Sequence, residues 1–211
     1  METLTTIINL FLHVDKNLMM IIEQFGAWSY GILFGVIFME TGFVVTPFLP
    51  GDSLLFAAGA LGARGSFNMT GLYLLMLAAA IGGNTLNYWI GRFIGPKAFE
   101  MDGRFLKKKY MNKAQAFFDK HGSKTIILTR FVPIVRTFAP FVAGVSKMNF
   151  AKFMLFNTLG GLAWVSLMLW SGFFFGNIPI VKTNFHYVVL GIIFVSILPM
   201  VWEVIKAKNE K

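Results

Sequence analysis

The chain has 211 residues, of which 56% are hydrophobic and 14% are charged, with 24 Phe, 12 Met and no Cys. This composition indicates a polytopic membrane protein rather than a soluble domain, and the absence of Cys excludes disulfides, thiol chemistry and Cys-ligated metal. The net charge is +9, but nine of the 19 basic residues fall within 92–124, against three acids. A short basic block between apolar segments is typical of a cytoplasmic loop and argues against nucleic-acid binding.

The first 23 residues carry apolar side chains at mostly helical spacing, interrupted by Asp15, Lys16 and Glu23. The apolar part before Asp15 is too short to cross a hydrocarbon core of about 30 Å. We therefore expect 1–23 to form an amphipathic helix at the membrane interface. A tilted first span is the alternative.

Charge-free runs long enough to cross a bilayer predict three transmembrane helices. We place them within one domain at 24–205, at about 69–91, 153–176 and 184–203. If the basic block is cytoplasmic, the first span runs inward, the second outward and the third inward. The short basic tail at 206–211 then lies in the cytoplasm as well, in agreement with its charge.

Two other apolar segments are each interrupted by two charged residues: 24–63 by Glu40 and Asp52, and 125–146 by Arg130 and Arg136. A charge at membrane depth costs about 2.5–3.5 kcal/mol on insertion scales, so each needs a partner or a water-filled cavity. Irregular backbone at that depth must also face protein or water. We predict two re-entrant hairpins, opening on the outer and the cytoplasmic face respectively, that point at each other.

A weak internal repeat supports this arrangement. The sequence WIGRFIG at 89–95 recurs as WSGFFFG at 170–176, 81 positions later, and Asn68 aligns with Asn149 at the same offset. An Ala-Gly pair at 58–59 recurs at 143–144 with an offset of 85. A hairpin and a span, repeated once in the opposite orientation, are the plan of inverted-repeat transporters. The alternative is that Gly-rich helix ends recur because small residues allow close packing.

Arg130 and Arg136 are the candidate substrate-binding residues. They are six positions apart and would not share a face of one unbroken helix, but Pro133 between them and Pro140 after them disfavour a straight helix. Two guanidinium groups converging in a cavity would hold a phosphate by paired charge-assisted hydrogen bonds, better than two lysines. The alternative is that both arginines pair with the two acids of the first hairpin and hold the hairpins together.

Glu40 and Asp52 are the candidate proton carriers. A turn containing Pro50 and Gly51 separates them and would bring both acids to one depth. Burial disfavours the charged form of a carboxyl group and a nearby arginine favours it, and such opposed effects suit proton exchange near neutral pH. The alternatives are structural pairing with the arginines and, for Asp52, capping of the helix that begins at Ser53.

Other polar or turn-forming residues are expected to line the cavity: Asn84, Asn87, Pro50, Gly51, Pro133 and Thr137. The two asparagine amides serve either to line the cavity or to join helices. The three histidines are scattered without ligand spacing, so we predict no metal site and no cofactor.

Two long motifs carry a resemblance to a known family: ETGFVVTPFLPGDSLLFAAGAL at 40–61 and KHGSKTIILTRFVPIVRTFAPFVAG at 120–144. They closely resemble the DedA family of bacterial inner-membrane proteins, which share the VTT domain with eukaryotic lipid scramblases. The resemblance covers nearly the whole chain and implies an all-α membrane protein with two facing re-entrant hairpins that acts in lipid transport.

Members of that family are linked to recycling of undecaprenyl phosphate, and others to phosphatidylethanolamine. The resemblance also implies that Glu40, Asp52, Arg130 and Arg136 are needed for function. One position departs from the family pattern, because Asn84 stands in the first span where the family carries an acid. This departure argues against a proton relay through that position.

We therefore expect a bacterial inner-membrane lipid transporter, not an enzyme, that moves undecaprenyl phosphate from the outer to the inner leaflet in exchange for protons. Phosphatidylethanolamine or general phospholipid transport is the alternative. A lipid phosphatase is a more remote one, because hydrolysis needs a nucleophile or a metal that the motifs lack. The expected partners are a phospholipid or polyprenyl phosphate and protons, without nucleic acid, and the oligomeric state is left open.

Overall fold

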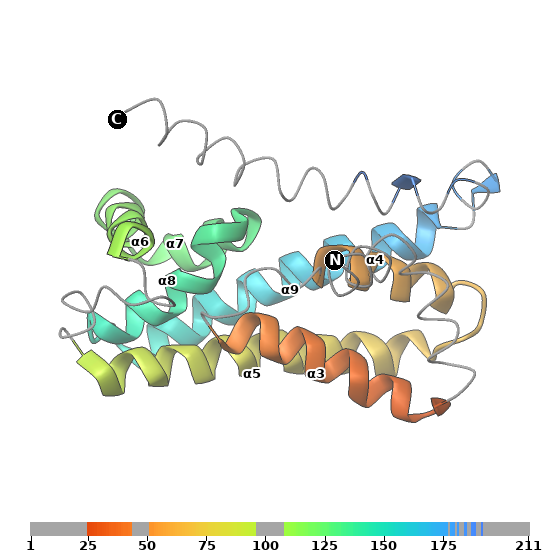
Figure 1. The fold of residues 1–211 in the computed structure, drawn as a ribbon, viewed down its shortest axis with the longest axis horizontal. Coiled ribbons are helices and arrows are strands. Elements are labelled where there is room, and N and C mark those ends of the chain that lie inside the picture. Colours follow the sequence, from red (N-terminus) through yellow and green to blue (C-terminus); the bar gives the residue numbers. More distant parts are fainter. Residues whose placement is uncertain are drawn as a thin grey trace, which may run out of the picture.

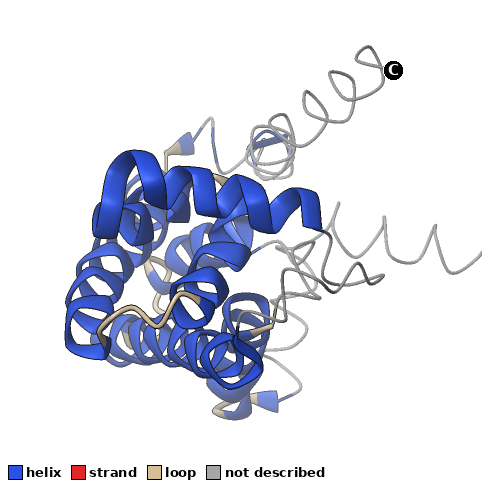
Figure 2. Cartoon of the chain, turned by 90° about the vertical axis from the view of Figure 1, so that its left-hand side faces the viewer, coloured by secondary structure: helices blue, strands red, loops and turns tan. Residues whose placement is uncertain are grey.

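The computed structural model describes residues 25–43, 51–95 and 108–176, together with isolated positions between 178 and 191. This part of the chain is helical and contains no strand, which confirms the predicted all-α class for the described residues (Figure 2). The interfacial helix predicted at 1–23 and the tail at 206–211 lie outside the described residues. So does nearly all of the third span predicted at 184–203.

The helices follow one another along the chain as α3 (Trp28–Gly42), α4 (Gly51–Gly62), α5 (Met69–Ile94), α6 (Lys108–His121), η2 (Gly122–Lys124), α7 (Thr125–Leu128), η3 (Thr129–Phe131), α8 (Pro133–Val145) and α9 (Phe150–Phe175). Both α5 and α9 have 26 residues and are apolar enough to cross a membrane. At 1.5 Å per residue each is about 39 Å long, more than the roughly 30 Å of a hydrocarbon core. They lie where the first two spans were predicted.

The two long helices begin in the same way. The Asn68 side chain accepts the Gly71 N–H at 2.9 Å at the start of α5, and the Asn149 side chain accepts the Lys152 N–H at 3.1 Å at the start of α9. Each asparagine thereby satisfies a first-turn donor that has no partner within its helix. Because the starts and the ends of the two helices are both 81 positions apart, the sequence repeat coincides with the helix boundaries.

The repeat also governs the packing. Helices α5 and α9 run in opposite directions, and each is crossed by a helix of the other half, α8 on α5 and α4 on α9 (Figure 1). At each crossing a glycine of one helix lies against a carbonyl of the other, with no room for a Cβ: Gly91 against Phe141, Gly144 against Tyr88, Gly172 against Phe56 and Gly59 against Leu169. Small residues let two helix backbones approach in this way.

These four contacts form two equivalent pairs. Gly91 corresponds to Gly172 at the offset of 81, and Gly59 corresponds to Gly144 at the offset of 85. The carbonyls that they meet follow the same two offsets, since Phe56 and Phe141 are 85 positions apart and Tyr88 and Leu169 are 81 apart. The internal repeat therefore describes two halves that interlock crosswise, while re-entry of the hairpins into a membrane stays a prediction.

The second hairpin segment is bent at Pro133, as the sequence predicts. Val132 is extended, with φ −116° and ψ 100°, and Pro133 is the first residue of α8, where its missing N–H costs nothing. Pro140 behaves differently from our expectation, because it lies inside α8 without ending the helix. A proline removes one intrahelical bond, and α8 is held nonetheless by buried side chains on both sides of Pro140, such as Phe138 and Phe141.

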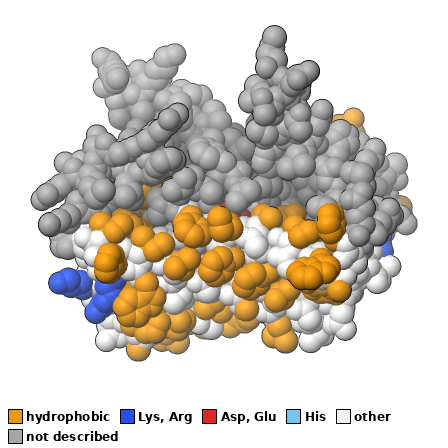
Figure 3. Space-filling model, turned by 60° about the horizontal axis from the view of Figure 1, so that its bottom comes forward, with side chains coloured by type: hydrophobic (Ala, Val, Ile, Leu, Met, Phe, Trp, Pro, Cys, Tyr) orange, Lys and Arg blue, Asp and Glu red, His pale blue; other side chains and the backbone are white. Residues whose placement is uncertain are grey.

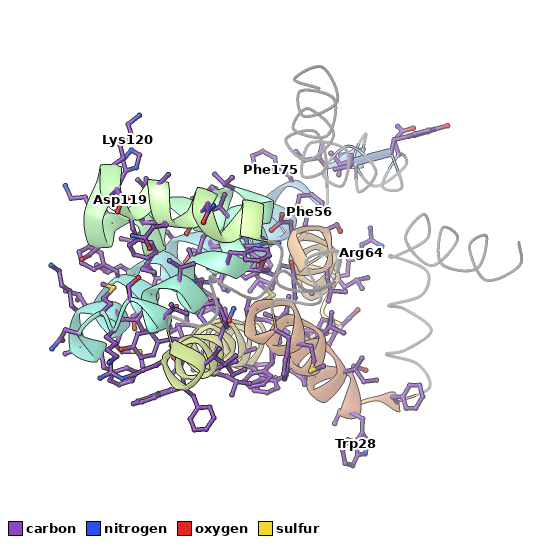
Figure 4. The ribbon with its side chains drawn as sticks, turned by 60° about the vertical axis from the view of Figure 1, so that its left-hand side comes forward. Trp28, Phe56, Arg64, Asp119, Lys120 and Phe175 are labelled. Atoms are coloured by element: carbon purple, nitrogen blue, oxygen red, sulfur yellow. The ribbon has the colours of Figure 1, made fainter. Side chains whose placement is uncertain are left out.

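The outer surface of the described helices is apolar. Large hydrophobic side chains of α5 and α9 are exposed, including Leu74, Phe93, Leu155 and Phe174. Hydrophobic side chains are spread along the described face in Figure 3, and Lys and Arg are seen at its two ends. In Figure 4, Asp119 and Lys120 on α6 lie far from Trp28 and Arg64 at the other end. An apolar surface of this extent between polar ends is typical of contact with lipid.

Candidate functional site

Arg136, on α8, is paired with both acids of the first hairpin segment. Its Nη1 donates to Oδ1 of Asp52 at 2.8 Å and its Nη2 donates to Oε1 of Glu40. Glu40 lies near the end of α3 and Asp52 in the first turn of α4, so this cluster joins three helices. Glu40 is completely buried and Arg136 is 6% exposed. With both acids ionised, the cluster carries a formal charge of −1.

Gly51 has a packing function beside this cluster. The second carboxylate oxygen of Glu40 lies directly against Gly51, and a Cβ at that position would collide with it. Of the other turn residues expected here, Pro50 lies outside the described residues. The turn therefore contributes a close approach of backbone to carboxylate rather than a side chain that lines a cavity.

Trp164, near the middle of α9, is a site residue that the sequence analysis did not identify. Its Nε1–H donates to Oδ1 of Asp52 at 2.8 Å, and the guanidinium carbons of Arg136 and Arg130 lie 5.2 and 5.9 Å from its ring centroid. These distances are typical of cation–π contacts. A tryptophan far from the interfacial belts is the signal that was available, because a buried indole N–H requires an acceptor.

Arg130, in η3, has no such acidic partner among the described residues. Its Nη2 donates to Oδ1 of Asn157 at 2.7 Å and, at 3.3 Å each, to the backbone carbonyls of Asn157 and Ala80. The residue is 2% exposed, and its Nε and Nη1 have no hydrogen-bond partner within the described part of the chain. Its acceptors among these residues are all neutral, so no described carboxylate compensates its positive charge by a direct bond.

A layer of buried amides surrounds the arginines. Asn84 Nδ2 donates to Asn157 Oδ1 at 3.0 Å and joins α5 to α9. Asn87 Nδ2 donates to the carbonyls of Thr137 at 2.7 Å and Thr41 at 3.3 Å and joins α5 to α8 and α3. Both amides therefore join helices, as one of the two interpretations held. Their Oδ1 atoms are buried and accept from no donor in the described ranges.

Asn157 is a second site residue that the sequence did not identify. Thr137, which the sequence did identify, contributes its backbone carbonyl as the acceptor for Asn87. The signal for Asn157 was a single amide within the apolar run of α9. Among the described residues no group of three or more His, Cys, Asp and Glu side chains comes together. Arginines, carboxylates and amides are thus the chemical groups that this site offers.

The distribution of charge is uneven. Two arginines and two carboxylates are formally neutral in sum, but both carboxylates are bonded to Arg136. The positive charge of Arg130 faces neutral amides and carbonyls instead. Buried charges normally have ionic partners or bound ions, and unbonded guanidinium donors are suited to the oxygens of a phosphate or a carboxylate.

Comparison with known proteins places the chain in a family. A family model described as the VTT domain matches residues 49–174. The protein DedA of Escherichia coli K12 is 49% identical over 212 residues, covering 99% of this chain and 97% of that protein. The chain belongs to the DedA family. No solved structure matches this DedA-family chain.

Other relatives of this DedA-family protein are named as membrane proteins. An uncharacterized membrane protein of Mycobacterium tuberculosis is 47% identical over 173 residues, covering 80% of this chain and 75% of that protein. The inner membrane protein YghB of Escherichia coli K12 is 38% identical over 172 residues, covering 81% and 77%. Together with two helices able to cross a bilayer, these names identify a membrane protein.

Proposed function

We propose that this protein carries an anionic lipid across the membrane and binds its phosphate group at Arg130, with undecaprenyl phosphate, moved from the outer to the inner leaflet, as the leading substrate. One observation supports this most strongly. Arg130 is buried, has no carboxylate partner among the described residues and keeps Nε and Nη1 unbonded. Nη1 carries two N–H groups and Nε a third, and each is a charged donor suited to a phosphate oxygen. The prenyl tail would stay in the surrounding lipid.

Arg136 takes part in this proposal only after Glu40 has taken up a proton. In the structure it is bonded to Glu40 and Asp52, and its Nε has no partner among the residues that the structure describes. A proton taken up by Glu40 would remove one negative charge and weaken one of these bonds, so that Arg136 joins Arg130 in holding the phosphate. The charge balance favours this joint uptake, because a phosphate monoanion and a proton that enter together leave the cluster of two arginines and two acids formally neutral.

A phosphodiester headgroup such as that of phosphatidylethanolamine is the second candidate. This candidate is favoured because both described ion pairs of the cluster involve Arg136, which leaves Arg130 as the arginine without a carboxylate partner among the described residues. One guanidinium is enough to bind the single negative charge of a phosphodiester. We propose transport rather than phosphate hydrolysis because the groups bonded to Arg130 are an amide and carbonyls. None of these is a nucleophile.

Reconstitution in liposomes tests the proposal. The full chain is inserted into vesicles containing undecaprenyl phosphate or phosphatidylethanolamine, and the transfer of each lipid between leaflets is timed. We expect acceleration by the wild type and none by Arg130→Gln. Arg64→Gln, at the far end of the molecule from α6 (Figure 4), is the matched control and should behave as wild type. If the wild type accelerates neither lipid, the proposal is refuted.

A further inference from the structure

We infer that Asn157 is a positioning residue, which holds Arg130 through a neutral amide and thereby keeps the guanidinium charge available for an anion. The inference rests on the proposed binding of a lipid phosphate at Arg130. It concerns how α9 presents that arginine, and it gives a function to a residue that the motifs of the two hairpin segments do not include.

The hold is one-sided. Asn157 bonds only Nη2 of Arg130, through Oδ1 at 2.7 Å and through its backbone carbonyl at 3.3 Å. Nε and Nη1 have no partner on any described residue. Gly160, one turn further along α9, lies against the same side chain, and a Cβ there would come within 3.1 Å of Cδ and Nε of Arg130. Arg130 is thus held at Nη2 and packed against Gly160 at Cδ and Nε. Its Nε and Nη1 keep their N–H groups available for a ligand.

The orientation of the amide is set by its other contacts. Nδ2 of Asn157 donates to the carbonyl of Ile81 at 3.1 Å and to Oγ1 of Thr85 at 3.3 Å. A carbonyl only accepts, so the NH₂ end must face Ile81 and the oxygen must face Arg130. Oδ1 also accepts from Asn84 at 3.0 Å. Three contacts from α5 therefore fix the completely buried Asn157 in the one orientation that suits the arginine.

The contrast with Arg136 shows what the neutral group achieves. Arg136 has two carboxylates on its Nη atoms, whereas the closest acceptor of Arg130 is an amide oxygen. An aspartate at 157 would have nearly the same shape as asparagine and would bind Nη2 more strongly. It would also neutralise the guanidinium, and a lipid phosphate would then have to compete with a resident anion.

A positioning function and a purely structural function of Asn157 predict opposite orders of lipid affinity for its aspartate and serine variants. Purified full-length wild type, Asn157→Asp and Asn157→Ser are titrated with undecaprenyl phosphate in detergent, and the unfolding midpoint is measured without lipid. We expect binding to weaken several-fold in Asn157→Ser and more than tenfold in Asn157→Asp, a loss larger than any change in midpoint explains, because in Asn157→Asp the new ion pair with Arg130 offsets the lost donation to Ile81. A purely structural residue predicts the reverse, because aspartate keeps the shape and serine loses every side-chain contact to Arg130.

Asn149→Asp is the matched control, since the same change on the same helix keeps an N-cap acceptor and should bind as wild type. Wild-type affinity in Asn157→Asp, or weaker binding only in proportion to a lowered midpoint, overturns the inference. Should Asn157→Asp not fold, Asn157→Ser decides by the same criteria. Arg130→Gln in the same titration separates the two proposals: if it binds as wild type the proposed function fails, and if it alone loses binding only the inference about Asn157 fails.

Discussion

Removing Arg136 and removing Glu40 should destabilise the protein by different amounts. Arg136→Gln leaves two carboxylates without their cation, one completely buried and the other 13% exposed. Breaking a buried ion pair from one side costs about 3–5 kcal/mol, and here two pairs are broken at once. Glu40→Gln leaves Arg136 bonded to Asp52 at 2.8 Å and keeps an acceptor in place of the lost one, so we expect a cost of about 1–2 kcal/mol.

The assay is reversible unfolding of the purified variants in detergent at neutral pH, followed by helical circular dichroism. Arg64→Gln is the control for loss of an arginine outside the cluster and should change the free energy of unfolding by less than about 0.5 kcal/mol. The double variant Glu40→Gln with Arg136→Gln should be more stable than Arg136→Gln alone, because one orphaned carboxylate has been removed. Equal costs for the two single variants would refute the argument that Arg136 is the shared partner of both acids.

Three further predictions follow from individual contacts. Gly144→Ala should destabilise the protein by about 1–3 kcal/mol through overpacking, because its Cβ would meet the backbone of α5. Gly35→Ala, which has nothing within 4 Å of its Cβ, should unfold as wild type. Equal unfolding midpoints of the two variants would contradict the close crossing of α8 and α5. Trp164→Phe removes the N–H donor to Asp52 at 2.8 Å and should cost about 1 kcal/mol, while Trp164→Leu, which also removes the ring, should cost about 1–2 kcal/mol more. Binding of a phosphodiester lipid, whose own charge does not titrate near neutrality, should strengthen as pH falls in the wild type and not in Glu40→Gln; a persisting pH dependence in the variant would exclude Glu40 as the proton carrier.

Some features of this fold can be predicted from the sequence because they depend on residues that are close together in the chain. Asn68 and Asn149 stand at equal offset from each other and both cap a long helix, and charge-free runs mark where those helices lie. The bend at Pro133 follows likewise from the chemistry of one residue. The charged residues of the two hairpin segments could be selected as site candidates because charge in an apolar segment is costly.

The pairing within the site could not be predicted, because it depends on how the halves interlock. The sequence left open whether both arginines face an anion or both pair with acids. In the structure the two arginines differ: Arg136 forms ion pairs with both acids, and Arg130 donates a hydrogen bond to Asn157. Trp164 and Asn157 lie on α9 among apolar residues, and only the approach of η3 and α8 to that helix shows what their polar atoms contact. Pro140 does not end α8, because packing of the buried side chains around it outweighs one missing helical hydrogen bond.

Binding of undecaprenyl phosphate to the purified protein, compared with binding of undecaprenol, tests the central claim most directly. The two lipids share a tail and differ in the phosphate, so the difference in affinity measures recognition of the headgroup. If Arg130 holds the phosphate, the wild type prefers undecaprenyl phosphate, and Arg130→Gln loses that preference by a factor on the order of 10–100, as expected for charge-assisted hydrogen bonds worth about 1.5–3 kcal/mol. An undiminished preference in Arg130→Gln would contradict the account.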